Sequence, residues 1–399
     1  MFLELTVSNY KNHVLAQLGT YARQKDRIDQ TFISKFISGV DTVKFTGIYG
    51  FNNKDTTDLL KVFVLIADFT TSKKRVLNKP TTSKMFTKNL LAELHGNDTD
   101  KPTFVSMHFF LDNQIFEYTL EVQDGKVIAE KVTTDSFTHQ NEEPKLLLSR
   151  QLLPNSSYEV IVNDGNDEKR FVVPFSGAWE SIVSAFAPSH YAAKLIFDYM
   201  NGKFTTNLDS IDNEVSDACS VYCNNPTVLD DAQEILRALD LLPINSEVII
   251  THDDITGYTV EVYYKNDRID GKAIVFTFDE QSSGFRYMFC LLSKIIPVVN
   301  NGGLCVINHL DEHLHCLVAE ALVSIFNAKK CHAQAQCLAT FKSTHLLKKL
   351  KHDQVYFVDA VNGKLSVKSA EQFCIRSDAD LEDMLYRDQL IKLPSLKLS

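Results

Sequence analysis

The chain has 399 residues and a formal net charge of −10, with 44% hydrophobic and 23% charged residues. This balance is typical of a globular protein whose core needs neither disulfides nor metals. It argues against a membrane-spanning protein, because no apolar run reaches the roughly 20 residues that a membrane helix needs. The acidic balance disfavours broad electrostatic binding to nucleic acid, and leaves a local basic groove as the remaining route to it.

The N-terminal residues alternate between apolar and polar from Met1 to Val7, which predicts a strand and not a signal peptide. Several of the eight cysteines, such as Cys290 and Cys305, lie inside apolar runs, where free thiols pack as small hydrophobes. We therefore expect a cytoplasmic protein without a disulfide framework. A basic cluster near the C-terminus reads as a solvated helix face and comprises Lys342, Lys348, Lys349, Lys351 and His352.

Strand patterns dominate the first third of the chain. Residues 44–49 form a short β-rich run that ends at Gly50. Residues 103–122 alternate around the turn signal Asp112-Asn113, and 123–126 predict a second hairpin turn. The polar stretch 136–144 predicts a surface loop.

Helical spacing of apolar residues begins near Ala178, and we expect a helical insertion over 178–245. Strand patterns return over 247–264. The last 135 residues then alternate, with strands predicted at 274–278, 304–307, 338–341 and 355–358 and helices from about Gly284 and Leu314. This alternation predicts an α/β sheet with crossover helices. The predicted organisation is a core of residues 1–177 and 246–399, interrupted by the insertion.

A degenerate phosphate-binding loop follows the strand at 44–49. Such a loop reads G-x-x-x-x-G-K-[ST] between a strand and a helix. Gly50 and Thr57 stand at the correct spacing, while Asp55 occupies the second glycine position and Thr56 the lysine position. Lys54 precedes them, and a solvent-facing orientation is the simpler interpretation of that lysine.

This segment resembles the loop "IYGxNxxGKSNLLKA" of the ABC-type ATPases of bacterial phage-defence and abortive-infection systems. Residues 7–11 resemble the first strand of that family, and residues 103–132 its antiparallel arm. The resemblance implies an ABC-ATPase-like α/β sheet of the P-loop type, with an antiparallel β arm and an inserted helical region.

The resemblance continues in order along the C-terminal half. Ser282, Ser283 and Gly284 resemble the ABC signature, and the run 301–315 resembles "GGxLVIDELDxSLHP", the Walker B strand and D-loop. Lys342 stands where the switch histidine is expected. The resemblance therefore assigns the Walker B positions to Asn308 and His309 and the D-loop positions to Asp311 and His315.

The departures from the family pattern remove the charges of the nucleotide site. Thr56 cannot neutralise the β- and γ-phosphates as the loop lysine does. Asp55 places a carboxylate near the phosphate position, Asn308 is neutral where an aspartate would hold Mg²⁺, and His309 replaces the glutamate that activates water. With Lys342 in place of the switch histidine, the sequence predicts a catalytically inactive protein that needs no cofactor.

Two elements that act across an ABC dimer interface are retained. Ser282 and Gly284 keep the signature, and Asp311 and His315 keep the D-loop pattern. One interpretation is a preserved dimer surface, and the other is that these residues are helix caps and turn residues. Histidines at 309, 313 and 315 lie close together in the sequence, which is a pattern that also suggests a zinc site. The Walker B to D-loop assignment disfavours this interpretation.

We therefore predict an inactive ABC-ATPase-like interaction or scaffold subunit that acts in phage defence or counter-defence through a protein partner or self-association. The alternatives are a subunit whose signature completes a partner's ATP site and a nucleic-acid-associated ATPase with a rearranged pocket. The defence role rests on the resemblance alone.

Overall fold

The computed structural model describes most of the chain. The described residues are 1–22, 33–34, 41–72, 90–135, 144–165, 167–174, 180–207, 211–253, 257–265, 273–328, 330–361, 364–373 and 379–391. The loop predicted over 136–144 lies outside this set except for Pro144, as does the start of the predicted insertion at 178–179.

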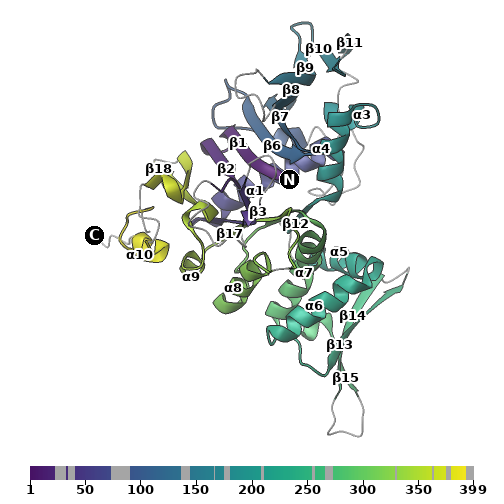
Figure 1. The fold of residues 1–399 in the computed structure, drawn as a ribbon, viewed down its shortest axis with the longest axis vertical. Helices are drawn as coiled ribbons and strands as arrows, with labels where there is room; N and C mark the ends of the chain where they lie inside the picture. The colour runs from purple at the N-terminus through teal and green to yellow at the C-terminus, as the bar shows by residue number, and fades with distance from the viewer. Residues whose placement is uncertain are drawn as a thin grey trace.

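A mixed sheet of 14 strands connects the upper and central parts of the molecule (Figure 1), counted over the described residues. Its order is β11-β10-β9-β8-β7-β6-β1-β2-β19-β18-β5-β17-β16-β12. The strands are β1 (Phe2–Tyr10), β2 (His13–Gly19), β5 (Phe45–Tyr49), β6 (Thr103–Leu111), β7 (Gln114–Gln123), β8 (Lys126–Asp135), β9 (Lys145–Leu152), β10 (Ser157–Asn163), β11 (Glu168–Pro174), β12 (Phe204–Asn207), β16 (Gly303–Ile307), β17 (Ala335–Phe341), β18 (Val355–Val361) and β19 (Lys364–Ser369).

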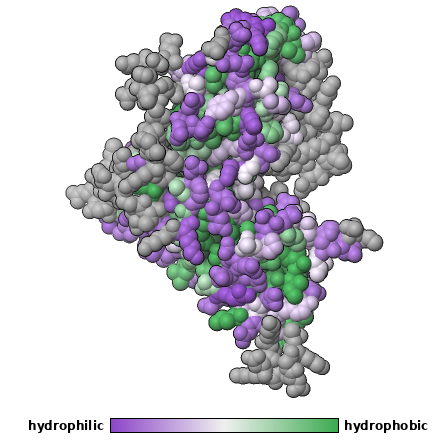
Figure 2. All heavy atoms as spheres, turned by 45° about the vertical axis from the view of Figure 1, so that its right-hand side comes forward, coloured by the Kyte–Doolittle hydropathy of each residue, from purple (hydrophilic) through white to green (hydrophobic). Residues whose placement is uncertain are grey.

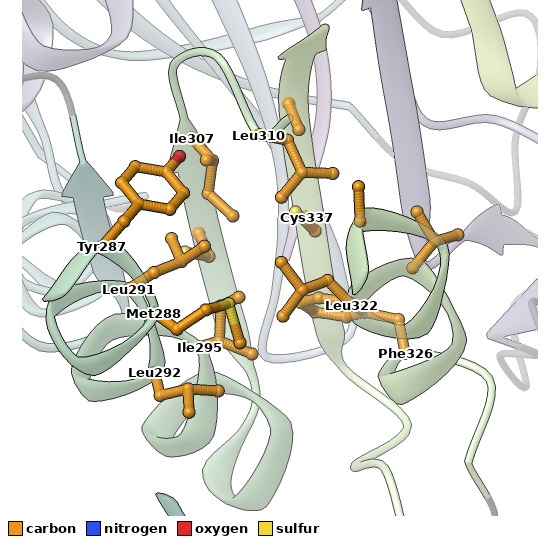
Figure 3. Close-up of a cluster of buried hydrophobic side chains, with 14 of the residues drawn as sticks. Tyr287, Met288, Leu291, Leu292, Ile295, Ile307, Leu310, Leu322, Phe326 and Cys337 are labelled. Atoms are coloured by element: carbon orange, nitrogen blue, oxygen red, sulfur yellow. The ribbon is translucent and has the colours of Figure 1, made fainter. Parts of the chain in front are cut away.

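The strands from β18 to β12 are parallel and form the α/β half of the sheet. They are buried on both faces, because α1 (Asn53–Thr71) and α4 (Tyr191–Gly202) share one core cluster with them while α7 (Ser283–Asn301) and α8 (Cys316–Ile325) share the other. Successive residues of β16 alternate between the two clusters. Figure 3 shows the second cluster, where apolar side chains of α7 and α8 pack around Ile307 and Cys337. The predicted α/β fold class is confirmed by this arrangement.

The antiparallel half is the arm predicted from residues 103–132. It pairs β6, β7 and β8 in register and continues through β9 to β11. Both predicted turns are confirmed, since Asp112, Asn113, Asp124 and Gly125 all have positive φ, as two-residue hairpin loops require. The arm forms the upper part of Figure 1.

The segment 178–245, predicted as a helical insertion, is not purely helical. Its helices are α3 (Ile182–Phe186), α4, α5 (Ile211–Asn224) and α6 (Pro226–Ala238), but β12 lies among them and pairs in parallel with β16. Furthermore, α3 and α4 pack with the first core cluster, whereas α5 and α6 pack with the second. Periodicity detected the helices but missed a four-residue strand that is specified by its pairing with β16.

A small antiparallel sheet lies beside α5 and α6 at the lower end of Figure 1 and has the order β13-β14-β15. Its strands are β13 (Ser246–Asp253), β14 (Gly257–Lys265) and β15 (Ala273–Thr277), as the strand patterns over 247–264 and 274–278 predicted. Among the described residues, no helix combines the length and the apolar character needed to cross a membrane.

The remaining elements are the two-stranded sheet of β3 and β4 and several short elements of the C-terminal half. They are β3 (Ile33–Ser34), β4 (Thr42–Val43), η3 (Phe278–Glu280), α9 (Thr344–Leu347), η4 (His352–Gln354), η5 (Ala370–Phe373) and α10 (Leu381–Tyr386). The basic cluster is partly neutralised there, because Lys348 pairs with Glu382 at 2.7 Å and Lys349 with Glu320 at 3.3 Å. The fifth member, His352, is buried and does not lie on a solvated helix face.

Candidate functional site

Three segments assigned from the sequence meet at one edge of the parallel sheet. Gly50 follows β5, Asn308 follows β16 and Lys342 follows β17. Because these strands are parallel neighbours, their carboxyl ends lie at the same edge, which is where α/β sheets bind ligands. The structure therefore brings the predicted phosphate loop and the Walker B-like and switch-like residues together.

Two backbone N–H groups at the start of α1 bond to Asn52. The helix starts at Asn53, and Asn52 caps it by accepting a hydrogen bond from the Lys54 N–H at 3.2 Å. The Thr56 N–H also donates to the Asn52 carbonyl oxygen at 3.4 Å. In a phosphate-binding loop such N–H groups point at the anion. Here two of them bond within the loop itself.

Thr56, at the lysine position, is buried and 2% exposed. Its methyl carbon lies so close to Gly50 that a Cβ on that glycine would approach it to 2.6 Å. Gly50 is thus required for the packing of the Thr56 methyl group under the loop. The position supplies no positive charge to the site.

Asn308 is the centre of a hydrogen-bonded group. Its Oδ1 accepts from the Thr57 hydroxyl and from the Thr340 hydroxyl, each at 3.0 Å. The His309 N–H donates to Thr340 Oγ1 at 2.8 Å, and His309 Nε2 lies 3.4 Å from Thr57 Oγ1. The threonine and Walker B-like positions therefore contact each other as a Mg²⁺ site would require, but the pair carries no negative charge.

His309 is half-buried and has a positive φ of 54°. Burial lowers the pKa of its imidazole, with Lys342 nearby adding to that shift and Glu312 and Asp311 opposing it. The hydroxyl of Tyr287, on the signature-like helix α7, donates to the His309 carbonyl oxygen at 2.9 Å. The ring is thus neutral near pH 7 and joined through its backbone to α7.

Acidic groups also lie around the start of α1. Asp55 is in the first helical turn, where a carboxylate interacts favourably with the positive end of the helix dipole. Lys11 is paired with Asp58 at 2.6 Å, so this lysine is neutralised within the chain. Lys54 is exposed, as expected from the sequence.

The signature-like residues start α7. Ser282 is its N-cap and accepts from the Phe285 N–H at 3.2 Å, and both Ser282 and Ser283 are exposed. A Cβ on Gly284 would lie 3.4 Å from the carbonyl oxygen of His313, so this glycine permits close packing of the D-loop-like segment on α7. The cap interpretation therefore describes Ser282, while its exposure leaves the surface open to a partner.

The D-loop-like residues have local structural roles. Asp311 Oδ2 accepts from the N–H groups of Lys342 at 3.0 Å and Ser343 at 2.6 Å, which fixes the chain as it leaves β17. His315 caps α8 through Nδ1, which accepts from the Leu317 N–H at 3.3 Å. The zinc alternative loses its helical geometry, because His309 and His313 both have positive φ. Within the described ranges, no group of three or more potential metal ligands is assembled.

Sequence reasoning missed Thr340, Tyr287 and the Lys11–Asp58 pair. Thr340 is a polar residue in a strand that is otherwise apolar at its carboxyl end, and that contrast is a usable signal. Tyr287 lies in an apolar helical run and was indistinguishable from core. The Lys11–Asp58 pair joins β1–β2 to α1 across 47 residues, a contact that only the fold reveals.

A buried histidine lies beside this site and predicts a pH effect. His13 is 1% exposed, and neither ring nitrogen makes a hydrogen bond of good geometry with the described residues. Burial lowers its pKa, against the opposing influence of the Asp55 backbone and the carboxylates of Asp55 and Asp58. A histidine with a lowered pKa in the folded protein stays neutral there, whereas in the unfolded chain it takes up a proton below a pH of about 6.5. The free energy of unfolding is therefore unaffected by this histidine above that pH and decreases as the pH falls below it.

We therefore expect the free energy of unfolding of His13→Phe to fall less than that of the wild type as the pH is lowered from about 6.5 to about 5. The substitution keeps an aromatic ring beside Tyr10, which stacks on His13. The measurement is the urea midpoint at several pH values, and His332→Phe, which changes a histidine that is exposed, is the control. Parallel pH profiles for the wild type and His13→Phe would contradict the assignment.

No family model matches this chain, and no curated protein matches it. Among solved structures, it is similar to an SMC head bound to the C-terminal winged-helix domain of ScpA, with 10% identity, a TM-score of 0.48, and 96% of this chain and 99% of that one covered. An SMC head domain from Thermotoga maritima gives 10% identity, a TM-score of 0.41 and coverage of 92% and 98%. The third structure is an SMC head with an extended coiled coil, bound to the C-terminal domain of ScpA derived from Pyrococcus furiosus. It has 10% identity and a TM-score of 0.43, with 93% of this chain and 97% of that chain covered.

Proposed function

We propose that this protein is an ABC-ATPase-like interaction subunit that does not hydrolyse ATP. The observation that carries the proposal is an assembled site at the ends of β5 and β16 in which the lysine and Walker B-like positions are neutral. The Thr57 and Thr340 hydroxyls both donate to Asn308 Oδ1, while the lysine position is occupied by the buried, neutral Thr56.

Each function of a phosphate site is affected in this arrangement. Phosphate charge is not compensated at Thr56, two loop N–H groups are used by Asn52, and Asp55 places its carboxylate at the positive end of α1. Asn308 offers a metal an amide oxygen without charge. A neutral His309 could accept a proton, but without phosphate and metal binding it has no positioned water to activate.

We expect no ATP turnover above background from the purified protein with Mg²⁺, whereas typical enzymes turn over about once per second or faster. The assay is phosphate release. The matched control is Thr57→Ala with Asn308→Ala: residual release that this variant leaves unchanged is contamination. Turnover near 1 per second that the control abolishes would overturn the proposal and favour the rearranged ATPase.

A second candidate is a subunit that completes a partner's ATP site. The exposed Ser282 and Ser283 at the start of α7 favour it, because a signature acts on the nucleotide of the opposing chain. Ser283→Arg would then abolish the partner's ATPase activity without unfolding this chain. The biological setting that we propose, phage defence or counter-defence, follows from the family resemblance and is tested by phage plating on host cells with and without the gene.

A further inference from the structure

Strand β15 is an outer strand of the small sheet, and within the part of the chain that the structure describes no further strand pairs with it. It is the outer strand of the order β13-β14-β15, so alternate backbone groups along it face away from the sheet. Edge strands are normally protected by charged residues, prolines or bulges. Ala273–Thr277 contains no charge and no proline. By contrast β11, an edge of the large sheet, carries Glu168, Lys169, Arg170 and Pro174.

Three consecutive apolar side chains of β15 are exposed on both faces of the sheet. The exposed fractions are 42% for Ile274, 41% for Val275 and 39% for Phe276. Ile274 and Phe276 share the face of Val262 and Tyr264, which packs towards the core, and yet they remain partly uncovered. Figure 2 shows hydrophobic side chains gathered on this lower part of the molecule, where Figure 1 draws the three strands.

The strand is complementary to itself about its middle residue. If two copies pair in antiparallel fashion with Val275 facing Val275, Ile274 of each copy faces Phe276 of the other, and Ala273 faces Thr277. The exposed apolar side chains then cover one another on both faces. Such an isologous contact is the common form of a homodimer interface.

This pairing keeps the two copies of Glu261 apart. Glu261 is the register partner of Thr277, so it lies one strand away from the proposed contact. The two Glu261 residues would lie about 20 Å apart by strand spacing and rise, beyond the screening length of about 8 Å in physiological salt.

We infer that β15 pairs with β15 of a second copy to form a continuous six-stranded sheet and a nucleotide-independent homodimer. This inference rests on the proposed function, because it names the partner that an interaction subunit without an ATP-driven closure would use. The dimer surface lies beside the signature-like residues, since η3 and Ser282 follow β15 directly in the chain.

The experiment is light scattering of the full chain at about 50 μM without nucleotide, followed by oxidation of Val275→Cys in a Cys223→Ser, Cys316→Ser, Cys374→Ser background. We expect a dimer, loss of that dimer in Val275→Lys, and a disulfide-linked dimer for Val275→Cys, since Cα atoms of directly opposite residues lie within disulfide reach. The matched controls are Val172→Lys and Val172→Cys on β11, whose side chain is 64% exposed. They should leave the dimer intact and fail to cross-link.

A monomer in the wild type, or a dimer that Val275→Lys does not disturb and Val275→Cys does not link, would overturn the inference. The result is independent of the phosphate-release assay. A monomer without ATP turnover would refute β15 pairing alone, whereas a β15 dimer that hydrolyses ATP would refute the proposed function alone. Far-ultraviolet circular dichroism of Val275→Lys distinguishes loss of pairing from loss of folding.

Discussion

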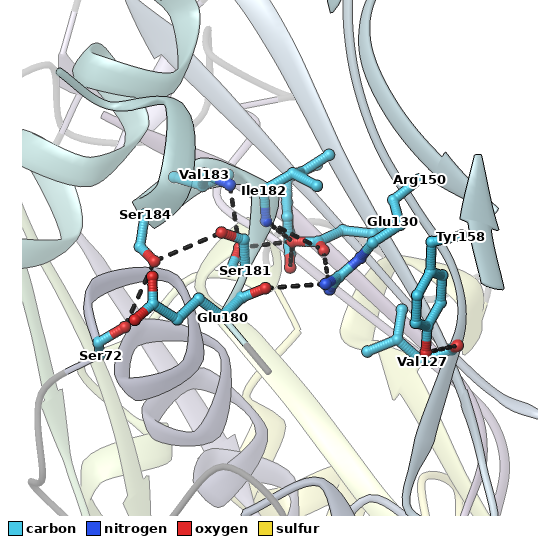
Figure 4. Close-up of polar contacts among 11 residues, drawn as sticks. Ser72, Val127, Glu130, Arg150, Tyr158, Glu180, Ser181, Ile182, Val183 and Ser184 are labelled. Carbon is cyan, nitrogen blue, oxygen red and sulfur yellow. Dashed lines mark hydrogen bonds and ion pairs between the residues drawn. The ribbon is translucent and has the colours of Figure 1, made fainter. Parts of the chain in front are cut away.

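Replacing Glu130 with alanine is expected to lower the free energy of unfolding by about 3–5 kcal/mol, because it leaves Arg150 as an uncompensated buried charge. The Glu130 carboxylate is fully buried and pairs with Arg150, whose side chain is 3% exposed. It also accepts from the Tyr118 hydroxyl at 2.9 Å, the Ser181 hydroxyl at 2.5 Å and the Ile182 N–H at 3.1 Å. Figure 4 shows Arg150, Ser181 and Ile182 around the carboxylate.

This network joins the arm to the helical segment that follows it. Glu130 and Arg150 come from β8 and β9, whereas Ser181 and Ile182 start α3. Arg150 also donates to the Glu180 carbonyl oxygen at 2.8 Å and lies over the Tyr158 ring at 5.2 Å. Burial raises the pKa of Tyr118, so its hydroxyl remains a donor at neutral pH. Loss of the carboxylate therefore removes the acceptor for several buried donors at once.

The measurement is the urea unfolding midpoint, with Glu117→Ala as the matched control. Glu117 also lies on the arm and pairs with His108 at 3.3 Å, but both side chains are about a third exposed. Exposed pairs contribute about 0–1 kcal/mol. The double change Glu130→Met with Arg150→Met should recover only the part of the loss that comes from the uncompensated Arg150 charge, because Tyr118, Ser181 and Ile182 would still lack the acceptor that Glu130 provides. Equal midpoints for Glu130→Ala and Glu117→Ala would show that the network does not stabilise the fold.

The sequence predicted the parts of the fold that depend on local pattern. The hairpin turns at Asp112 and Asp124 follow from residues that tolerate positive φ, and the alternation of strands and helices after residue 273 follows from periodicity. The strand β12 was missed because four residues between helices have too short a pattern, and their pairing with β16 is a tertiary property. The Glu130 network could not be predicted, since its members span residues 118–182.

The sequence predicted which positions would form the candidate site, but not the hydrogen bonds that their side chains and backbone make. Spacing placed Gly50, Thr57 and Asn308, and parallel strand order brought them together. Spacing could not show that α1 starts at Asn53 and uses loop N–H groups, or that Asp311 and His315 serve the turn after β17 and the start of α8. These roles depend on hydrogen bonds between segments distant in sequence.

Restoring the charges of the phosphate site is expected to restore nucleotide binding. The variant combines Asp55→Gly, Thr56→Lys and Asn308→Asp, which removes the carboxylate, adds the phosphate cation and adds the metal ligand. Asp55→Gly also weakens the first turn of α1, which frees backbone N–H groups for an anion. The wild type should show almost no change in melting temperature with millimolar Mg²⁺–ATP, whereas the variant should gain several degrees.

The size of that gain follows from binding to the native state, which contributes about 2.7 kcal/mol at a ligand concentration of 100 Kd. The matched control carries Thr56→Ala in place of Thr56→Lys, so it has the same loop flexibility without the cation. Adding His309→Glu to the restored variant then tests the base, because the Thr57 hydroxyl and the exposed Ser282 are already present. A wild type that ATP stabilises as strongly as the restored variant would show that Thr56 and Asn308 do not disable the site. Equal shifts for the lysine and alanine variants would show that the missing lysine is not the defect, and would assign it to the changes that both variants share, at Asp55, at Asn308 and in the backbone at the start of α1.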